Sequence, residues 1–223
     1  LVAAAPGAAG VLDDGDQLVR TLIMFVAFSL AASGTYYWND LLDVEADRAH
    51  PTKSKRPIAS GQVPIGVARV VGTALLVGGV ALAFVPGWKA GLTVLVYVAL
   101  TVTYSTTWKH LAVLDLIAVA GGFVLRAVGG AAATSVEMST WFILCTTFGS
   151  LFIVAGKRYA ELRELGDDAR TTRATLDQYS LGYLRIVLSV SCGAALVAYC
   201  LWDFDTKELT GSEWPFYELS IVP

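Results

Sequence analysis

Residues 21–39 read TLIMFVAFSLAASGTYYWN and carry no Asp, Glu, Lys or Arg. A helix rises about 1.5 Å per residue, so this stretch matches the roughly 20 residues that a helix needs to cross about 30 Å of hydrocarbon. Four further stretches are also free of these charged residues, namely 70–88, 90–108, 138–156 and 186–202. We therefore expect an all-α fold, a polytopic bundle of transmembrane helices.

Two other apolar segments extend the predicted bundle. Residues 111–133 include Asp115 and Arg126, and residues 215–223 resemble a helix that stops before it is complete. The chain starts at Leu1, inside an Ala-rich segment. We expect one integral-membrane domain over residues 1–223, with about seven helices represented and further sequence missing at both ends.

The composition excludes several other classes of protein. Of the 223 residues, 55% are hydrophobic and only 16% are charged, which does not fit a disordered chain or a secreted disulfide scaffold. The three cysteines fall inside predicted spans and have no metal-ligand spacing, so we interpret them as small apolar core residues. They are Cys145, Cys192 and Cys200.

Charge is distributed unequally between the two sides of the predicted bundle. If the spans alternate across the bilayer, ten of the sixteen basic residues lie on one side, and most of the acidic residues outside the 39–47 segment lie on the other. The positive-inside rule makes the first side cytoplasmic. Its basic residues are Arg48, Lys53, Lys55, Arg56, Lys109, Lys157, Arg158, Arg163, Arg170 and Arg173.

The segment NDLLDVEAD, residues 39–47, lies at the cytoplasmic end of the first span. On a continuous helix, Asp40, Asp43 and Asp47 would fall within a stripe about 60° wide. Three carboxylates in one stripe favour a bound cation, and Mg²⁺ uses one or two carboxylates together with phosphates and waters. We predict a catalytic Mg²⁺–diphosphate site here. A solvated acidic helix end is the simpler alternative.

Basic residues follow this acidic segment within one Pro-rich loop. Lys53 and Arg56 flank a prolyl turn that restricts where they can point, and they could bind phosphate oxygens that the metal does not reach. For Lys55, the general positive-inside signal is the better explanation. Asn39 could orient a metal-bound water or cap a kink in the helix.

Residues 39–61, with NDLLDVEAD followed by RAHPTKSKRPIASG, resemble the first signature of the UbiA superfamily of intramembrane prenyltransferases. The element YSTTWK at residues 104–109 is also similar to a family element. The resemblance implies about nine transmembrane helices in the full protein, around a cavity that is capped on the cytoplasmic side and opens laterally to lipid.

The second signature differs from the usual acidic cluster of the family. Residues 156–164 read GKRYAELRE, which introduces Lys157 and Arg158 beside Glu161. Together with residues 43–52, this element resembles the decaprenyl-phosphate phosphoribosyltransferase branch of the superfamily. The resemblance implies transfer of 5-phosphoribosyl from phosphoribosyl pyrophosphate to a polyprenyl (decaprenyl) phosphate, which yields a precursor of cell-wall arabinan.

The resemblance and the charges together give the expected ligands. We expect Mg²⁺ as cofactor, phosphoribosyl pyrophosphate and a polyprenyl phosphate as substrates, the inner (plasma) membrane as location, and no nucleic-acid partner. We expect Asp40, Asp43 and Asp47 to bind the metal. The predicted substrate-binding residues are Asn39, Lys53, Arg56, Tyr104, Lys109, Lys157, Arg158, Tyr159 and Glu161.

Roles within this set are less specific. Lys157 and Arg158 point about 100° apart on a helix, so we assign one to the donor and the other to the acceptor phosphate or to Glu161. Asp115 could support the site, whereas Arg126 lies deeper and is expected to have a structural partner on another helix. For Tyr104, an interfacial position is as good an explanation as substrate binding.

Two other functions fit parts of the sequence. A polyprenyl diphosphate could replace the phosphoribosyl donor, with an aromatic acceptor, but the cations at Lys157 and Arg158 count against this. A transporter would place its binding groups near the midplane of the membrane, whereas these charges collect at one face.

Overall fold

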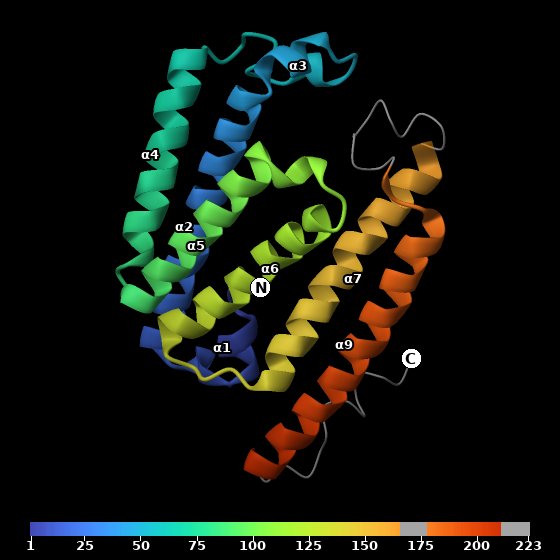
Figure 1. The fold of residues 1–223 in the computed structure, drawn as a ribbon. Helices are drawn as coiled ribbons and strands as arrows, with labels where there is room; N and C mark the ends of the chain where they lie inside the picture. Colours follow the sequence, from blue (N-terminus) through green and yellow to red (C-terminus); the bar gives the residue numbers. More distant parts are fainter. Residues whose placement is uncertain (166–177, 211–223) are drawn as a thin grey trace. The chain divides into compact units, whose positions relative to one another are not determined.

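The structure is a computed structural model that describes residues 1–165 and 178–210. Within those residues, the chain forms eight α-helices and three short 3₁₀ helices, which confirms the all-α prediction (Figure 1). The α-helices are α1 (Ala4–Ala8), α2 (Gly15–Leu42), α3 (Val44–Ala49), α4 (Ile65–Ala83), α5 (Trp88–Thr106), α6 (Leu114–Thr134), α7 (Thr140–Leu165) and α9 (Leu181–Thr210). The 3₁₀ helices are η1 (Val11–Asp13), η2 (Lys53–Lys55) and η3 (Trp108–His110).

Five of the described helices are long and apolar enough to cross a membrane: α2, α4, α6, α7 and α9. The charge-free segment 90–108 also becomes a long helix, α5, but it is not among these five. Its C-terminal half carries several hydroxyl groups, and those of Thr101 and Thr106 bond back to backbone carbonyls of the same helix. The helix expected at residues 215–223 lies outside the described residues.

The contacts divide the chain into two compact units, which are described separately. Unit 1 contains residues 1–106 and 125–136, and unit 2 contains residues 107–124 and 137–223. Helix α6 contributes its first half to unit 2 and its second half to unit 1. The single membrane domain expected from the sequence remains a prediction.

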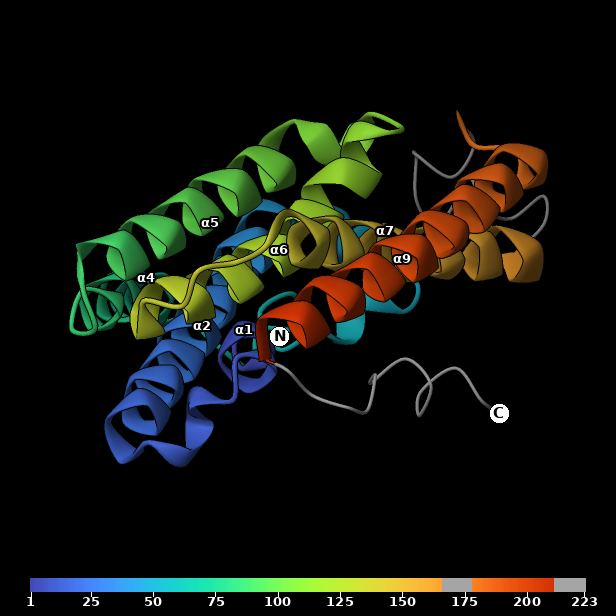
Figure 2. The ribbon, with the colours of Figure 1, turned by 90° about the horizontal axis from the view of Figure 1, so that it is seen from below.

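Unit 1 is built on the close packing of α2 against α4, which lie side by side in two perpendicular views (Figures 1 and 2). Gly79 of α4 allows this approach, because a Cβ atom there would lie 2.7 Å from the backbone nitrogen of Ala31 and 2.8 Å from the carbonyl oxygen of Ala27. Small residues at such contacts are typical of helices that pack inside membranes. Met24 and Phe28 continue the buried core on α2.

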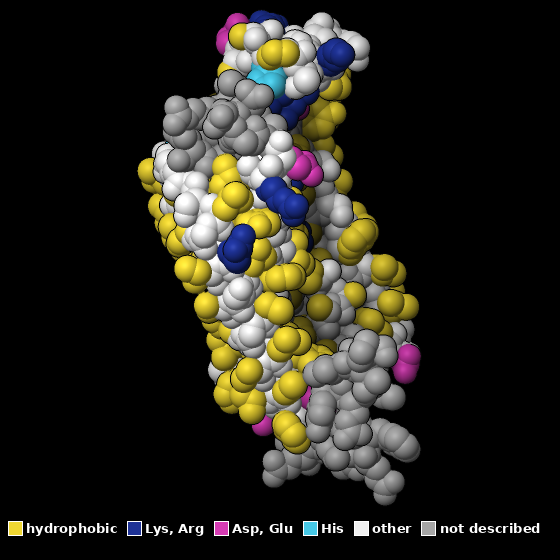
Figure 3. All heavy atoms as spheres, turned by 90° about the vertical axis from the view of Figure 1, so that its right-hand side faces the viewer, with side chains coloured by type: hydrophobic (Ala, Val, Ile, Leu, Met, Phe, Trp, Pro, Cys, Tyr) yellow, Lys and Arg dark blue, Asp and Glu magenta, His cyan; other side chains and the backbone are white. Residues whose placement is uncertain are grey.

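Unit 2 is built on an antiparallel pair, α7 and α9 (Figure 2). Leu116 of α6, Val154 of α7 and Leu184 of α9 form its buried core. Apolar side chains also cover much of the outer surface of the pair (Figure 3). Its exposed members include Phe152, Ile153, Ile186, Val190 and Val197, as expected for a surface that faces lipid.

The α2–α4 contact predicts that Gly79→Ala destabilises the protein. The added methyl group would meet backbone atoms of α2, and such overpacking costs about 1–3 kcal/mol. Gly78→Ala is the matched control, because a Cβ there meets nothing within 4 Å. Thermal unfolding in detergent, followed by circular dichroism, should show a lower Tm for Gly79→Ala only. Equal Tm values for the two variants would contradict the packing.

Candidate functional site

The acidic segment of the first span is divided between two helices. Helix α2 ends at Leu42, Asp43 leaves the helical conformation at φ −94° and ψ 5°, and α3 begins at Val44. The backbone N–H of Asp43 still donates to the carbonyl of Asn39 at 3.0 Å, and that of Asp47 donates to the carbonyl of Asp43 at 2.8 Å. The expected stripe on one continuous helix is therefore wrong in detail, because the helix changes direction at the middle aspartate.

Asp40 and Asp47 are nevertheless brought together by Arg56. One guanidinium nitrogen of Arg56 lies 2.9 Å from an oxygen of Asp40 and 2.8 Å from an oxygen of Asp47. Asp47 is buried, whereas Asp40 and Arg56 are partly exposed. Asp43 and Asp47 both act on Asp40 electrostatically. Three carboxylates and one guanidinium thus share a small region at the end of α2.

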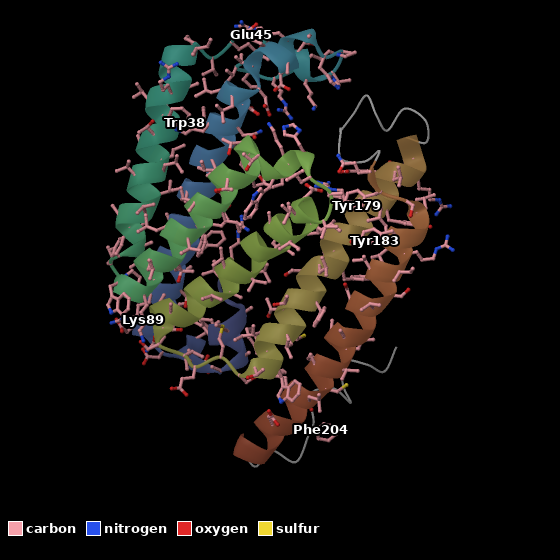
Figure 4. The ribbon with its side chains drawn as sticks, viewed as in Figure 1. Trp38, Glu45, Lys89, Tyr179, Tyr183 and Phe204 are labelled. Atoms are coloured by element: carbon pink, nitrogen blue, oxygen red, sulfur yellow. The ribbon has the colours of Figure 1, made fainter. Side chains whose placement is uncertain are left out.

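The loop that carries Arg56 has a defined fold. The ring nitrogen Nδ1 of His50 accepts hydrogen bonds from the backbone N–H groups of Thr52 and Lys53, at 3.2 and 3.3 Å. Arg48 donates to the carbonyl of Ala59 at 3.2 Å and so ties α3 to the end of the loop. The imidazole of His50 therefore shapes this turn. In Figure 4, the labels Trp38 and Glu45 mark the neighbouring parts of α2 and α3.

A cavity of about 270 Å³ lies beside this cluster. Asp40 is the one acidic residue among those that line it, and most of the lining is apolar. The family resemblance implies a cavity, but the sequence pattern did not identify these lining residues, since aromatic residues near the end of a span are also typical of a membrane interface. The lining residues are Ser33, Tyr36, Tyr37, Asp40, Pro57, Ile58 and Val63.

The acidic cluster offers carboxylate donors to a divalent cation. In the described part of the chain, no group of three or more His, Cys, Asp or Glu side chains has the arrangement of a complete metal site. Mg²⁺ does not require such a cage, because it is usually held by one or two carboxylates together with substrate phosphates and waters. Asp40, Asp43 and Asp47 supply oxygen donors of the right chemistry. They therefore fit a magnesium ion that arrives with a diphosphate.

The second predicted group lies in unit 2, on α7. Arg158 forms two hydrogen bonds with Asp115, at 2.7 and 3.1 Å, and a third with Glu161 at 3.0 Å. Arg158 is 4% exposed and Asp115 is not exposed at all. Asp115 thus holds Arg158, and Arg158 is the cation that reaches Glu161. Lys157, which points elsewhere on the helix, is exposed to solvent.

The remaining predicted residues are distributed over both units. Tyr104 lies in the last turn of α5 in unit 1, and Lys109 lies in η3 of unit 2. Tyr159 accepts a long hydrogen bond of 3.5 Å from Arg185 of α9, a residue that the sequence analysis did not single out.

The expectation for Arg126 is confirmed. Its guanidinium donates to the hydroxyl of Tyr97 on α5 at 2.9 Å and lies 4.8 Å from the centre of the ring. Tyr97 is buried and packs edge-on against Phe28. Arg126 therefore has the structural partner on another helix that an intramembrane cation requires.

Comparison with known proteins places these features in a family. Residues 1–209 match the UbiA prenyltransferase family. Over its whole length, the chain is 40% identical to a decaprenyl-phosphate phosphoribosyltransferase of Corynebacterium glutamicum, of which it covers 68%. It is 42% identical to the enzyme of the same name from Mycobacterium tuberculosis, again over the whole chain, and covers 74% of that protein.

A solved structure shares the fold. It is a UbiA homolog from Archaeoglobus fulgidus bound to GPP and Mg²⁺, with a TM-score of 0.67 and 18% sequence identity. The match covers 83% of this chain and 65% of that one, so the chain spans about two thirds of the solved protein. The family match over residues 1–209, the relatives at 40% identity and more, and the helical architecture agree: this integral membrane protein belongs to the UbiA prenyltransferase family.

Proposed function

We propose that the protein transfers a 5-phosphoribosyl group from phosphoribosyl pyrophosphate to a polyprenyl phosphate, such as decaprenyl phosphate, and releases pyrophosphate. The main support is the identity of 40% and 42%, over the whole chain, to two decaprenyl-phosphate phosphoribosyltransferases. The cationic second element is consistent with this donor, which carries a 5-phosphate in addition to its diphosphate.

The reaction exchanges one bond at C1 of the ribose. The C1–O bond to the diphosphate breaks, its electron pair leaves with pyrophosphate, and a phosphate oxygen of the lipid forms the new bond to C1. The acceptor is already ionised at neutral pH, so no strong general base is needed. The protein has to neutralise the leaving group. Direct attack by the lipid phosphate would invert the configuration at C1.

The acidic cluster is the proposed leaving-group site. Asp40, Asp43 and Asp47 would hold Mg²⁺, which supplies Lewis-acid neutralisation of the diphosphate when bound. Arg56 already lies among these carboxylates, and its side chain is 39% exposed, so it can donate to phosphate oxygens that reach the cluster. Lys53, in the same loop, is a second cation for these oxygens.

Unit 2 carries the other cations predicted to bind substrate. Lys157 is exposed, whereas Arg158 is held by Asp115 and Glu161, so Lys157 is the better candidate for direct contact with a substrate. Arg158 would then act by fixing the local structure of α7. Lys109 would contact the donor from η3. The positive-inside rule places all of these groups on the cytoplasmic face of the inner membrane.

A transfer assay tests the proposal. The full-length protein in detergent would receive labelled phosphoribosyl pyrophosphate and decaprenyl phosphate, with and without EDTA. We expect lipid-linked label that disappears with EDTA. Transfer from a prenyl diphosphate to an aromatic acceptor, without phosphoribosyl transfer, would overturn the proposal. So would the absence of any product together with substrate flux in liposomes, which would indicate a transporter.

The acidic cluster predicts that Asp43→Asn abolishes most of the activity. Loss of one carboxylate weakens neutralisation of the leaving group, and removal of such transition-state stabilisation lowers kcat by about 100-fold or more. Glu45→Gln is the matched control, because Glu45 lies two residues away, is exposed and pairs with Arg48. Equal activity of the two variants, with unchanged Tm, would show that Asp43 is not part of the site.

The loop predicts a different effect for Arg56→Met. Charge-assisted hydrogen bonds contribute about 1.5–3 kcal/mol, so we expect KM for phosphoribosyl pyrophosphate to rise about 10- to 100-fold. Lys55→Met is the control, because Lys55 is the exposed neighbouring cation that the positive-inside rule explains. Initial rates at varied donor concentration provide the measurement. A KM for Arg56→Met equal to that of Lys55→Met would contradict the role of Arg56.

A further inference from the structure

The turn between η3 and α6 contains a residue in an unfavourable backbone conformation. Val113 has a φ of 69°, in the left-handed region. A β-branched side chain rarely adopts this conformation, and it persists only where the surrounding structure enforces it. Residues held in this way are concentrated at functional sites. Val113 therefore requires a partner that keeps it in place.

Two side chains from a distant part of the sequence supply that partner. The side-chain oxygen of Gln178 accepts from the backbone N–H of Ala112 at 3.2 Å, and its side-chain nitrogen donates to the carbonyl of His110 at 3.1 Å. The hydroxyl of Tyr179 accepts from the backbone N–H of Val113 at 2.9 Å. We call these three hydrogen bonds the Gln178–Tyr179 clasp.

The clasp satisfies backbone groups that the helix cannot satisfy itself. The N–H groups of Ala112 and Val113 precede the first residues of α6, where donors have no carbonyl partner in the preceding turn. Helix bonding starts directly afterwards, since Asp115 donates to the carbonyl of Leu111 at 3.0 Å. The clasp therefore determines where α6 starts and in which direction it leaves the turn.

Residues with a predicted role in the site lie on both sides of the turn. Lys109 lies in η3, immediately before the turn, and Asp115 lies in the first turn of α6. Asp115 in turn holds Arg158 through two hydrogen bonds. Tyr179 is close enough to Asp115 and Arg158 to interact with both electrostatically. The Tyr179 hydroxyl is thus linked to the position of Lys109, a predicted donor ligand, and to that of the buried Asp115–Arg158 pair.

Packing around Tyr179 holds its side chain in place for the hydrogen bond to Val113. Its side chain is 7% exposed and packs with Leu116, Val154 and Leu184. Its ring stacks on that of Tyr183, with centroids 6.0 Å apart and an angle of 16° between the planes (Figure 4). Burial raises the pKa of the Tyr179 hydroxyl, so the group stays neutral over the working pH range.

We propose that Tyr179, assisted by Gln178, is a positioning residue: it holds Val113 in the left-handed conformation and thereby sets the position of Lys109 for the phosphoribosyl donor. This inference rests on the proposed function. It requires that removal of the hydroxyl alone, with the ring left in the core, changes donor binding.

The test compares Tyr179→Phe with Tyr183→Phe in the full-length enzyme. Tyr179→Phe keeps the buried ring and removes the hydrogen bond to Val113, so we expect KM for phosphoribosyl pyrophosphate to rise about tenfold, with kcat and KM for the lipid within about twofold of the wild type. Tyr183→Phe keeps the stacked ring and should leave all three constants unchanged. A general loss of structure would lower kcat and leave both KM values as they are, and that result would overturn the proposal.

A glycine at position 113 tests whether Tyr179 acts through Val113. Glycine adopts positive φ without strain, so it does not need the clasp. Val113→Gly in the Tyr179→Phe background should return KM for the donor to within about threefold of the wild type. Failure of this rescue in a double variant whose Tm matches that of the wild type would show that Tyr179 does not act through Val113.

A measurement without turnover separates this inference from the proposed function. If the wild-type protein transfers no phosphoribosyl group, the proposed function fails, and amide hydrogen exchange still tests the clasp. Tyr179→Phe should then accelerate exchange in residues 110–115 at least tenfold relative to Tyr183→Phe. Equal exchange in the two variants would show that the hydroxyl does not hold the turn.

Discussion

The bridge from Arg56 to Asp40 and Asp47 is the interaction on which the candidate site depends. Carboxylates brought together at a membrane interface repel one another, and a cation between them lowers that repulsion. Arg56 provides this cation at 2.9 and 2.8 Å, and in doing so it fixes the loop after α3 against the end of α2. The wall of the neighbouring cavity follows from the same contact, because Pro57 and Ile58 come directly after Arg56 and line it beside Asp40.

Unit 2 also pairs a carboxylate with a guanidinium. Because this pair is buried, its loss has a different effect from loss of the Arg56 bridge. Asp115 and Arg158 are 0% and 4% exposed, and removal of one partner of such a buried pair leaves an uncompensated charge, which is strongly destabilising. Arg56 is 39% exposed and can exchange a carboxylate for a phosphate at smaller cost. The buried pair therefore has to stay intact within the fold, whereas the exposed bridge is suited to substrate binding.

The sequence was sufficient for the features that depend on local pattern. Charge-free stretches predicted the positions of the long helices, and the cost of a cation inside the membrane predicted a partner for Arg126. The break at Asp43 could not be predicted, because helical periodicity gives the direction of each side chain but not the residue where a helix ends, and neither Gly nor Pro marks this end. The clasp could not be predicted either, since Tyr179 and Val113 lie 66 residues apart and meet only through the tertiary fold.

Mn²⁺ prefers oxygen ligands, as Mg²⁺ does, and its binding to the acidic cluster can be measured without turnover. We expect the cluster to become a metal site only when a diphosphate completes it. Electron paramagnetic resonance of the full-length protein, titrated with Mn²⁺, should show little bound ion until pyrophosphate is added, and one bound ion per chain afterwards. Tight binding of Mn²⁺ without pyrophosphate, or no binding with it, would contradict the account.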